Sequence, residues 1–589
     1  MQKHLKEKPD IMSLNAKCLQ FSFCALLAGF AFSSCSPTPP TSSADLVFQN
    51  GQIYTVEATS PWVEALGVKD GKIIALGNTT QSNNWIGDDT KVVDLKGKFM
   101  MPSFGDAHVH PVYGGLSYSR CSLHQSESIA TYLEIIQQCV DEAPDDGVVY
   151  GQGWLPGLFP PNGIPEKSLL DSISSTRPIV MRSTGGHSLW VNSAMLELAN
   201  ITKDTPDPPK GRIDRDPDTG EPIGGFQESA MELINIHIPE PTSNDIENAI
   251  SYTLKLFNSL GITNWFDAGI DVLENGDSPT LDAYESLQAS GKLTSHISIA
   301  AKYNNERSID QLGKLYDISE RAISSGFNAN AIKLYTDGVI VQKTAAVLEA
   351  YEGTAHNHGE LHIPIETLKP LITKLDRDGY QTYVHSIGDR AVHEALNAFE
   401  QAKKENGAND NRHFLTHLNF VAPIDHPRFA ELNVSANFQP LWATNDPYMK
   451  LTALQMGAER MKYVYPVNSI LQSGGKINYG SDWSVAPANP FYGLEVAVTR
   501  KPIDEPDAQA LNTSEAITLE DAVKAYTLNV AYITHRESET GSIAIGKSAD
   551  LIIADQNIFE IPENDISDTK VLTTVFKGKV VYGSFPVDQ

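Results

Sequence analysis

Residues 99–110, FMMPSFGDAHVH, form an apolar stretch that ends in two histidines separated by one residue. In a β-strand the side chains at i and i+2 lie on the same face, so His108 and His110 can reach one ion from the end of this strand. A single His-x-His pair is weak evidence for a metal site, because many such pairs are structural. Whether this pair binds a metal ion depends on which other ligands the chain provides.

Further apolar segments of the same kind follow, and helical stretches separate them. They are residues 262–269, 296–303, 330–338, 381–389, 412–420, 433–440 and 476–483. Strands that alternate with helices favour a parallel sheet, and together with 99–110 they make the eight strands that a (β/α)8 TIM barrel requires. We therefore expect an α/β fold of this type.

The regions outside the barrel also have recognisable patterns. Residues 120–240 contain their own strand and a Pro/Asp-rich stretch, which predicts an inserted α/β subdomain after the first barrel strand. Short alternating runs with Asn-Gly and Asp-Gly turns at 50–51 and 70–71 predict β-structure near the N-terminus, and the C-terminus has a similar pattern. We expect residues 45–98 and 535–589 to form one composite β-sandwich, which assigns 99–119 and 241–534 to the barrel.

Polar residues end several of the predicted strands. Lys333, His385, His417 and Asp482 each lie near the C-terminal end of a strand, where the active sites of barrel enzymes are found. Imidazole and carboxylate ligands suit Zn²⁺ and also Mn²⁺, Fe²⁺ or Ni²⁺. The sequence therefore predicts a divalent-metal site built from these residues together with His108 and His110.

With these residues in place, the chain resembles the amidohydrolase superfamily, and in particular amidohydrolase family 3, the YtcJ-like and N-substituted formamide deformylase-like proteins. The similar motifs include GHSLWVNSAML (186–196), GGFQESA (224–230), HSIGDRA (385–391) and GSIAIGKSADLIIAD (541–555). The resemblance covers roughly residues 45–585. It implies a metal-dependent barrel that hydrolyses an amide, N-formyl or cyclic amide C–N bond.

The resemblance also implies roles for the strand-end residues. Two ions, with Zn²⁺ as the first expectation, would be held by His108, His110 and Asp482 and by His385 and His417. Lys333, carboxylated to a carbamate, would lie between them, and Asp482 would be the catalytic proton carrier. Two alternatives stay open at this point: an ion pair of Lys333 with a nearby acid such as Asp337, and Glu228 as the bridging carboxylate.

Other residues are candidates for contact with substrate. His187 and Glu228 in the insertion, Gln439 at the end of a barrel strand and Trp154 form this group. A local structural hydrogen bond is the competing interpretation for His187, and a place in the core is the competing one for Trp154.

The N-terminus predicts export. Lysines precede the apolar run CLQFSFCALLAGFAFSS at 18–34, which is short for a membrane-spanning helix and typical of a signal peptide. Cys35 follows small residues, as in a bacterial lipobox. We expect a lipoprotein-type signal peptide at 1–34, lipidation at Cys35, a tether at 35–44, and a location in the cell envelope with membrane contact through the lipid alone. An ordinary cleaved signal peptide and a retained anchor remain alternatives, and a Cys121–Cys139 disulfide is left open.

Composition limits the partners. The formal net charge is −28 and no basic block occurs, so we expect no nucleic-acid partner. We expect a small-molecule substrate, and the sequence leaves a homo-oligomer open. Competing functions are hydrolysis of an ester or carbamate at the same site and a non-catalytic regulatory protein of the envelope that retains the fold.

Overall fold

The computed structural model describes residues 43–119, 121–124, 126, 128–143, 147–160 and 162–586. The predicted signal peptide, Cys35 and most of the tether lie outside these described residues. Within them, no helix is both long enough and apolar enough to cross a lipid bilayer.

Eight parallel strands form the central sheet, and they pair with one another in chain order. They are β8 (Phe104–Val109), β15 (Ile262–Ile270), β16 (His296–Lys302), β17 (Asn328–Tyr335), β18 (Gln381–Ser386), β19 (Phe414–His417), β20 (Ser435–Phe438) and β21 (Ile477–Tyr479). Each predicted barrel segment contributes one of them. The predicted TIM barrel is confirmed.

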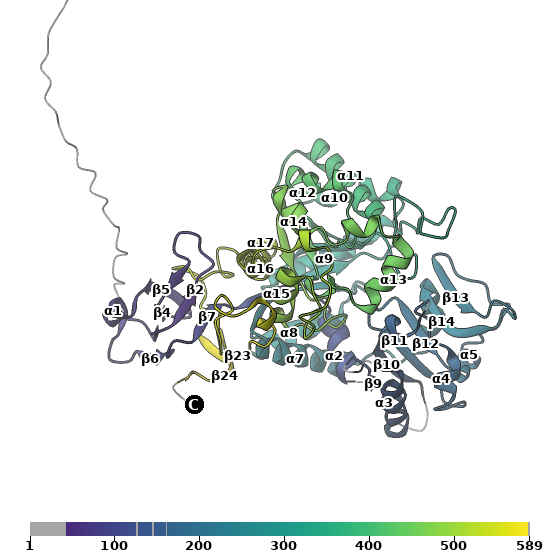
Figure 1. The fold of residues 1–589 in the computed structure, drawn as a ribbon, viewed down its shortest axis with the longest axis horizontal. Coiled ribbons are helices and arrows are strands. Elements are labelled where there is room, and N and C mark those ends of the chain that lie inside the picture. The colour runs from purple at the N-terminus through teal and green to yellow at the C-terminus, as the bar shows by residue number, and fades with distance from the viewer. Residues whose placement is uncertain are drawn as a thin grey trace, which may run out of the picture. The chain divides into compact units, whose positions relative to one another are not determined.

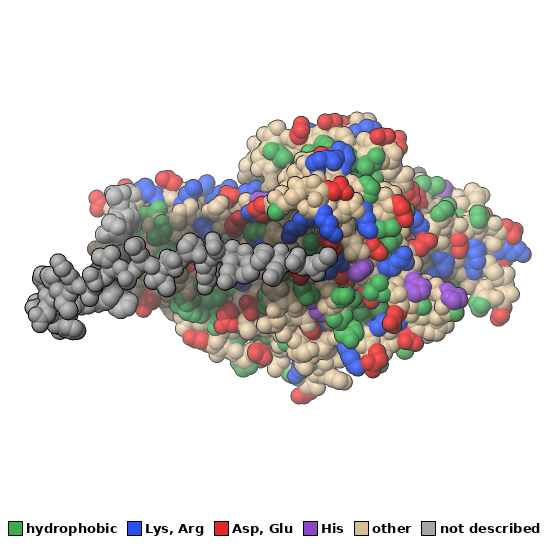
Figure 2. Space-filling view, turned by 90° about the horizontal axis from the view of Figure 1, so that it is seen from above, with side chains coloured by type: hydrophobic (Ala, Val, Ile, Leu, Met, Phe, Trp, Pro, Cys, Tyr) green, Lys and Arg blue, Asp and Glu red, His purple; other side chains and the backbone are tan. Residues whose placement is uncertain are grey.

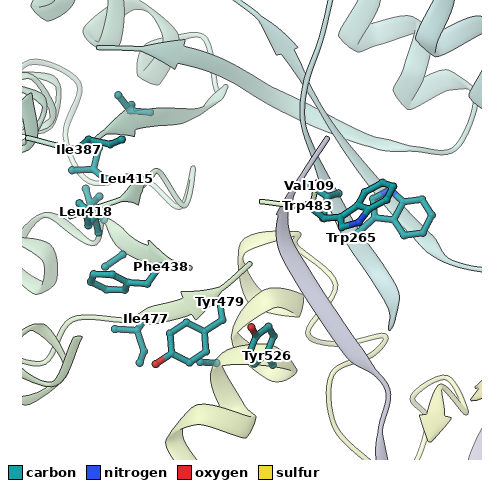
Figure 3. Close-up of a cluster of buried hydrophobic side chains, with 14 of the residues drawn as sticks. Val109, Trp265, Ile387, Leu415, Leu418, Phe438, Ile477, Tyr479, Trp483 and Tyr526 are labelled. Carbon is teal, nitrogen blue, oxygen red and sulfur yellow. The ribbon is translucent and has the colours of Figure 1, made fainter. Parts of the chain in front are cut away.

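The sheet is nearly closed where its first and last strands meet. Val109, the last residue of β8, forms a parallel bridge with Trp483, which lies just beyond β21. Figure 3 shows Val109, Trp265 and Trp483 within the large apolar core of this region. Because the closure is packed with buried aromatic side chains, the ends of β8 and β21 are held next to each other.

The segment 99–110, predicted as one strand, consists of two strands in different sheets. Its first part, β7 (Phe99–Pro102), pairs with β2 (Gln52–Tyr54) and β22 (Leu551–Ala554), whereas β8 begins the barrel at Phe104. The chain changes sheets at Ser103, whose N–H donates to the Asp550 carbonyl oxygen. Both parts are apolar and buried, so composition alone does not reveal the change.

Side chains fill the interior of the barrel. The cluster consists of Ala107, Phe266, Ala268, Ala300, Ala331, Tyr383, Phe414, Val530 and Ile533. The last two come from α17 (Leu528–Ile533), and the carbonyl oxygen of Ile533 accepts a hydrogen bond from Gln381, the first residue of β18. Helix α17 therefore covers the N-terminal end of the strands and leaves their C-terminal end for functional side chains.

Two smaller sheets lie outside the barrel, and one of them combines strands from both terminal regions, as Figure 1 shows for the early and late strands β2, β7 and β23. Their orders are β5-β4-β1-β6 and β24-β23-β22-β7-β2-β3. The remaining bounds are β1 (Leu46–Gln49), β3 (Trp62–Val63), β4 (Ala65–Lys69), β5 (Lys72–Gly77), β6 (Lys91–Asp94), β23 (Val571–Phe576) and β24 (Lys579–Gly583). The turn at 70–71 joins the antiparallel pair β4 and β5, whereas the turn at 50–51 joins strands of different sheets.

A further six-stranded sheet lies between β8 and β15 in the chain, in the order β13-β14-β12-β11-β10-β9. Its strands are β9 (Cys121–Ser122), β10 (Val149–Trp154), β11 (Ile179–Ser183), β12 (Ser188–Val191), β13 (Gly211–Arg215) and β14 (Pro222–Glu228). A disulfide joins Cys121 to Cys139. The sequence left this pairing open, and the structure shows that the two cysteines are bonded.

Helices occupy the connections between these strands. Near and within the insertion they are α2 (Pro111–Ser119), α3 (Ile129–Glu142), α4 (Lys167–Asp171), α5 (Ser193–Leu198) and α6 (Glu232–Asn235). In the barrel segment they are α7 (Ser243–Ser259), α8 (Pro279–Ala289), α9 (Leu312–Ser324), α10 (Ile365–Arg377), α11 (Asp389–Asn406), α12 (His426–Leu432), α13 (Pro447–Met456), α14 (Val467–Gln472), α15 (Pro490–Thr499) and α16 (Leu519–Tyr526). On the face shown in Figure 2, Lys and Arg side chains are interspersed with Asp and Glu.

Candidate functional site

The predicted ligands on the first and last barrel strands lie together. Nε2 of His108 and Nε2 of His110 are each 3.3 Å from Oδ1 of Asp482. The three side chains offer ligand atoms that all lie within 4.8 Å of one another. Asp106 holds this geometry, because its carboxylate accepts hydrogen bonds from the Ser481 hydroxyl and N–H and from the His108 N–H.

The histidines that end β18 and β19 join the same cluster. The ring centroids of His385 and His417 are 4.5 Å apart, and those of His108 and His417 are 4.8 Å apart. Nδ1 of His417 lies 3.9 Å from Oδ2 of Asp482. The structure therefore brings together all four predicted imidazoles and the predicted carboxylate.

Lys333 is fully buried on β17, and its ammonium group makes no hydrogen bond to the described residues. Its Nζ lies 4.2 Å from the centroid of the Tyr383 ring. Burial lowers the pKa of Lys333 to about 7. The alternative pairing with Asp337 is wrong, because that carboxylate accepts hydrogen bonds from the N–H groups of Ala346, Ile387 and Gly388 instead.

A ladder of buried hydrogen bonds behind the cluster determines which ring nitrogen of each histidine is free. The Thr416 hydroxyl donates to Oδ1 of Asn437 at 2.6 Å, so its oxygen accepts from Nδ1 of His108 at 2.9 Å. The Gln439 amide nitrogen donates to the same Asn437 oxygen, so Oε1 of Gln439 accepts from Nδ1 of His417 at 2.9 Å. In both histidines the proton is on Nδ1, and Nε2 carries the lone pair that a metal needs.

These residues fit a metal ion. Burial lowers the pKa of His108 and of His385 well below the usual value, and it lowers the pKa of His417 to about 3, so the rings are neutral ligands at pH 7. Nε2 of His108 and Oδ1 of Asp482 are buried and make no hydrogen bond to the described residues. Unpaired buried polar atoms are costly, and a divalent cation would satisfy both of them.

Backbone strain coincides with this region. His417, Asp482 and Glu228 have positive φ angles of 78°, 56° and 50°. Residues with side chains rarely adopt this left-handed conformation, which costs roughly 1–3 kcal/mol and is concentrated at functional sites.

The insertion contributes an ion pair to the same cavity. Nδ1 of His187 lies 3.0 Å from Oε2 of Glu228, and Thr344, in the loop after β17, donates to Oε1 of Glu228 at 2.8 Å. Burial opposes the charged form of His187, but the Glu228 carboxylate outweighs it and raises the pKa of the imidazole. Both carboxylate oxygens of Glu228 have partners, so the structure does not support Glu228 as the metal bridge.

The cluster opens into a cavity of about 700 Å³. His108, His110, His385, His417 and Asp482 line it, as do His187 and Glu228. Leu155, Leu158, Met231 and Trp442 give it apolar walls. A volume of this size and mixed character is typical of a small-molecule site.

Two predicted substrate contacts lie elsewhere. Gln439 does not line the cavity, because its amide lies between His417 and Asn437. Trp154 is fully buried in the core of the insertion, where its indole N–H donates to the Met181 carbonyl oxygen. The core alternative for Trp154 agrees with this position.

Several cavity residues were missed by the sequence analysis. Asp267 lies near the C-terminal end of β15 and accepts a hydrogen bond from Tyr284 at 2.8 Å, and Tyr113 and Arg182 also line the cavity. The position of Asp267 at a strand end was an available signal. Arg182 lies on β11 of the insertion, outside the motifs on which the resemblance rests.

Comparison with known proteins shows which family the chain matches. A model of the amidohydrolase family matches residues 91–582. The chain is 29% identical to protein LONG AFTER FAR-RED 3 of Arabidopsis thaliana over 558 residues, and this aligned region covers 93% of each chain. It is 24% identical over 551 residues to N-substituted formamide deformylase of Arthrobacter pascens, which covers 92% of this chain and 99% of the other.

Solved structures show the same fold. An uncharacterized metal-dependent hydrolase from Pyrococcus horikoshii has a TM-score of 0.67 and 22% sequence identity. The similarity covers 88% of this chain and 99% of that one.

Proposed function

The chain belongs to the amidohydrolase family and is a metal-dependent hydrolase, and from this premise we propose that it cleaves an amide, N-formyl or cyclic amide C–N bond. The observation that carries the proposal is that His108 and Asp482, which line one cavity, have buried atoms without a hydrogen bond among the described residues, as does the buried Lys333. The relative named N-substituted formamide deformylase supports the bond class.

We propose that two divalent ions, with Zn²⁺ as the first expectation, are held by the ligands His108, His110, Asp482, His385 and His417. When bound, such ions lower the pKa of coordinated water to about 7 and polarise a carbonyl group. Lys333 would join them as a carbamate. Its lowered pKa supports this, because only the neutral amine reacts with carbon dioxide, and near pH 7 a large fraction is neutral.

The protein itself would move the proton and exclude water. Asp482 takes the proton from the attacking water at a carboxylate oxygen and passes it to the leaving nitrogen. The apolar walls of the cavity limit the entry of other water molecules, which strengthens the electrostatic interactions inside it. His187, held by Glu228, provides a cationic hydrogen-bond donor on the cavity wall for the substrate.

Metal content and turnover test the proposal. The chain from Ser36 would be purified without chelator from medium with mixed divalent ions and bicarbonate, and then tested on formamides, amides, cyclic amides, esters and carbamates. About two equivalents of metal, reduced in Lys333→Ala, with turnover of an amide-type substrate, is the expected result. Turnover of esters or carbamates alone would replace the proposed bond. A folded protein that binds no metal and turns over no substrate would contradict the function.

We also propose export to the cell envelope with lipidation at Cys35. The disulfide between Cys121 and Cys139 supports an oxidising compartment. In a bacterial host, Cys35→Ser should move the protein from the membrane fraction to the soluble fraction and abolish labelling with fatty acid. Unchanged membrane association and no labelling of the original chain would contradict lipidation.

A further inference from the structure

The cavity contains a guanidinium group, that of Arg182, with no carboxylate of the described residues at ion-pair distance. Arg182, on β11, donates from Nε to the Tyr150 hydroxyl at 3.1 Å, from Nη1 to the Gly186 carbonyl oxygen at 3.4 Å and from Nη2 to Oδ1 of Asn235 at 2.9 Å. All three acceptors are neutral. A guanidinium has five N–H groups, so these bonds fix its orientation and leave two groups for another acceptor.

The other cations of the cavity have carboxylate partners. Nζ of Lys302 lies 3.1 Å from Asp271, and His187 is paired with Glu228. Among the described residues, no carboxylate lies within ion-pair distance of Arg182. Because an uncompensated charge in a partly buried place is costly, this arrangement indicates that an anionic group of the ligand compensates it.

A second donor lies close to Arg182. The hydroxyl of Tyr113 is buried and makes no hydrogen bond to the described residues, and the Arg182 guanidinium carbon is 6.0 Å from the Tyr113 ring centroid. Burial raises the pKa of Tyr113 above its usual value, so the phenol keeps its proton and can donate it. Tyr113 lies on α2, three residues after His110, which connects this position to the metal ligands.

We propose that Arg182 and Tyr113 bind a carboxylate of the substrate, and that the substrates are N-formyl or N-acyl derivatives of amino acids with apolar side chains. This substrate class rests on the proposed function. The Arg182 fork suits a carboxylate, which accepts two parallel N–H bonds, and the Tyr113 hydroxyl adds a third donor. One cation balances one carboxylate, whereas a phosphate carries more charge than this position compensates. The apolar walls formed by Leu155, Leu158 and Met231 suit the side chain.

A matched pair of substrates tests the subsite. N-formyl-L-phenylalanine and N-formyl-2-phenylethylamine differ only in the carboxylate, and the metal-loaded protein should favour the acid in kcat/KM. Arg182→Met should lower kcat/KM for the acid about 30-fold, the size expected for a charge-assisted hydrogen-bond pair, and change the value for the neutral compound less than about threefold. Tyr113→Phe, which removes one hydroxyl, should lower the acid value about fivefold.

Lys302→Met is the control, because it removes a cation of the same cavity that already has a partner. It should leave the ratio of the two kcat/KM values unchanged. An equal loss of preference in Lys302→Met and Arg182→Met would overturn the assignment, because the effect would then come from cavity charge in general. No preference for the acid in the original protein would also overturn it.

A binding experiment separates this proposal from the proposed function. Calorimetry would follow 3-phenylpropanoate and inorganic phosphate binding to the metal-loaded protein, with Arg182→Met, Arg182→Lys and Tyr113→Phe compared at equal metal content. Weaker binding of the carboxylate in all three variants supports the subsite even if no substrate turns over, in which case the proposed function alone fails. Carboxylate affinity that does not change in Arg182→Met and Tyr113→Phe places the acid elsewhere and overturns the inference, as does phosphate binding that exceeds carboxylate binding.

Discussion

Strand β19 has a histidine at each end, and the surroundings of the two differ. His413, just before the strand, accepts a hydrogen bond from the Thr382 N–H at Nδ1 and lies 2.8 Å from Asp376 at Nε2. His417, the last residue of the strand, has a partner for Nδ1 in Gln439, while its other nitrogen has none among the described residues. Both ring nitrogens of His413 have partners within the protein, whereas one ring nitrogen of His417 is available to coordinate a metal ion.

The same contrast extends to the two ends of the barrel. At the N-terminal end, His296 opens β16 with a 2.8 Å contact to Asp550. At the C-terminal end, His108, Lys333 and Asp482 each retain a buried atom without a hydrogen bond among the described residues. A histidine on a barrel strand therefore becomes informative about function when its position along the strand is known.

The largest expected effect is at Asp482, the carboxylate at the C-terminal end of the barrel strands. Asp482→Asn should lower kcat at least about 10³-fold, because it removes both a ligand and the proton carrier. Steady-state turnover at fixed metal would measure this. Asp376→Asn, the matched change at the opposite end, should retain turnover. Comparable losses in the two variants would remove the distinction between the ends.

A smaller effect is expected behind the ligands. Gln439→Leu should weaken metal affinity by about 10–100-fold, because the Nδ1 proton of His417 loses its acceptor and the ring its fixed orientation. Competition with a fluorescent chelator would measure the affinity. Gln381→Leu changes a buried glutamine at the N-terminal end of β18 and should leave the metal affinity unchanged. If Gln439→Leu binds metal normally, the ladder does not orient His417.

At the N-terminal end the expected effect is on stability. His413→Ala should reduce the free energy of unfolding by about 2 kcal/mol, because the Thr382 N–H and Asp376 lose a buried partner. The kcat/KM of the folded protein should stay within about twofold. Chemical denaturation and turnover would be measured on the same sample, and a loss of bound metal would argue against a purely structural role.

The smallest effect concerns pH. Since the pKa of Lys333 is about 7 in the fold and near 10.5 in an unfolded chain, its protonation opposes folding. This penalty is complete below pH 7 and disappears as the pH rises towards 10.5. In buffer that contains chelator and no carbon dioxide, the Tm of the original protein should rise by about 2 °C relative to that of Lys333→Met between pH 7 and 10. A constant difference between the two Tm values would show that the fold does not lower the pKa of Lys333.

The sequence predicted the barrel and the cluster of ligands because both depend on short-range patterns. Five of the predicted strands have a candidate ligand near the end, and its side chain could be assigned to the C-terminal end of the barrel once the strands were counted. His108, His110, His385, His417 and Asp482 lie together for this reason.

The remaining parts depend on contacts between distant residues. Gln439 directly follows β20, but only the position of Asn437 shows that its amide turns towards His417 and away from the cavity. The change of sheet at Ser103 lies inside an apolar run, so composition could not mark it. Arg182 reaches the cavity through the placement of the insertion, which no local pattern encodes.

The antiparallel pairing of β7 with β22 has a consequence for synthesis of the protein. This pairing joins the residues beside the first barrel strand to a segment near the C-terminus. A ribosome releases that C-terminal segment last, so β7 keeps an open edge throughout translation. A chain that terminates early cannot cover this edge, and the exposed strand would mark truncated products for chaperones and proteases.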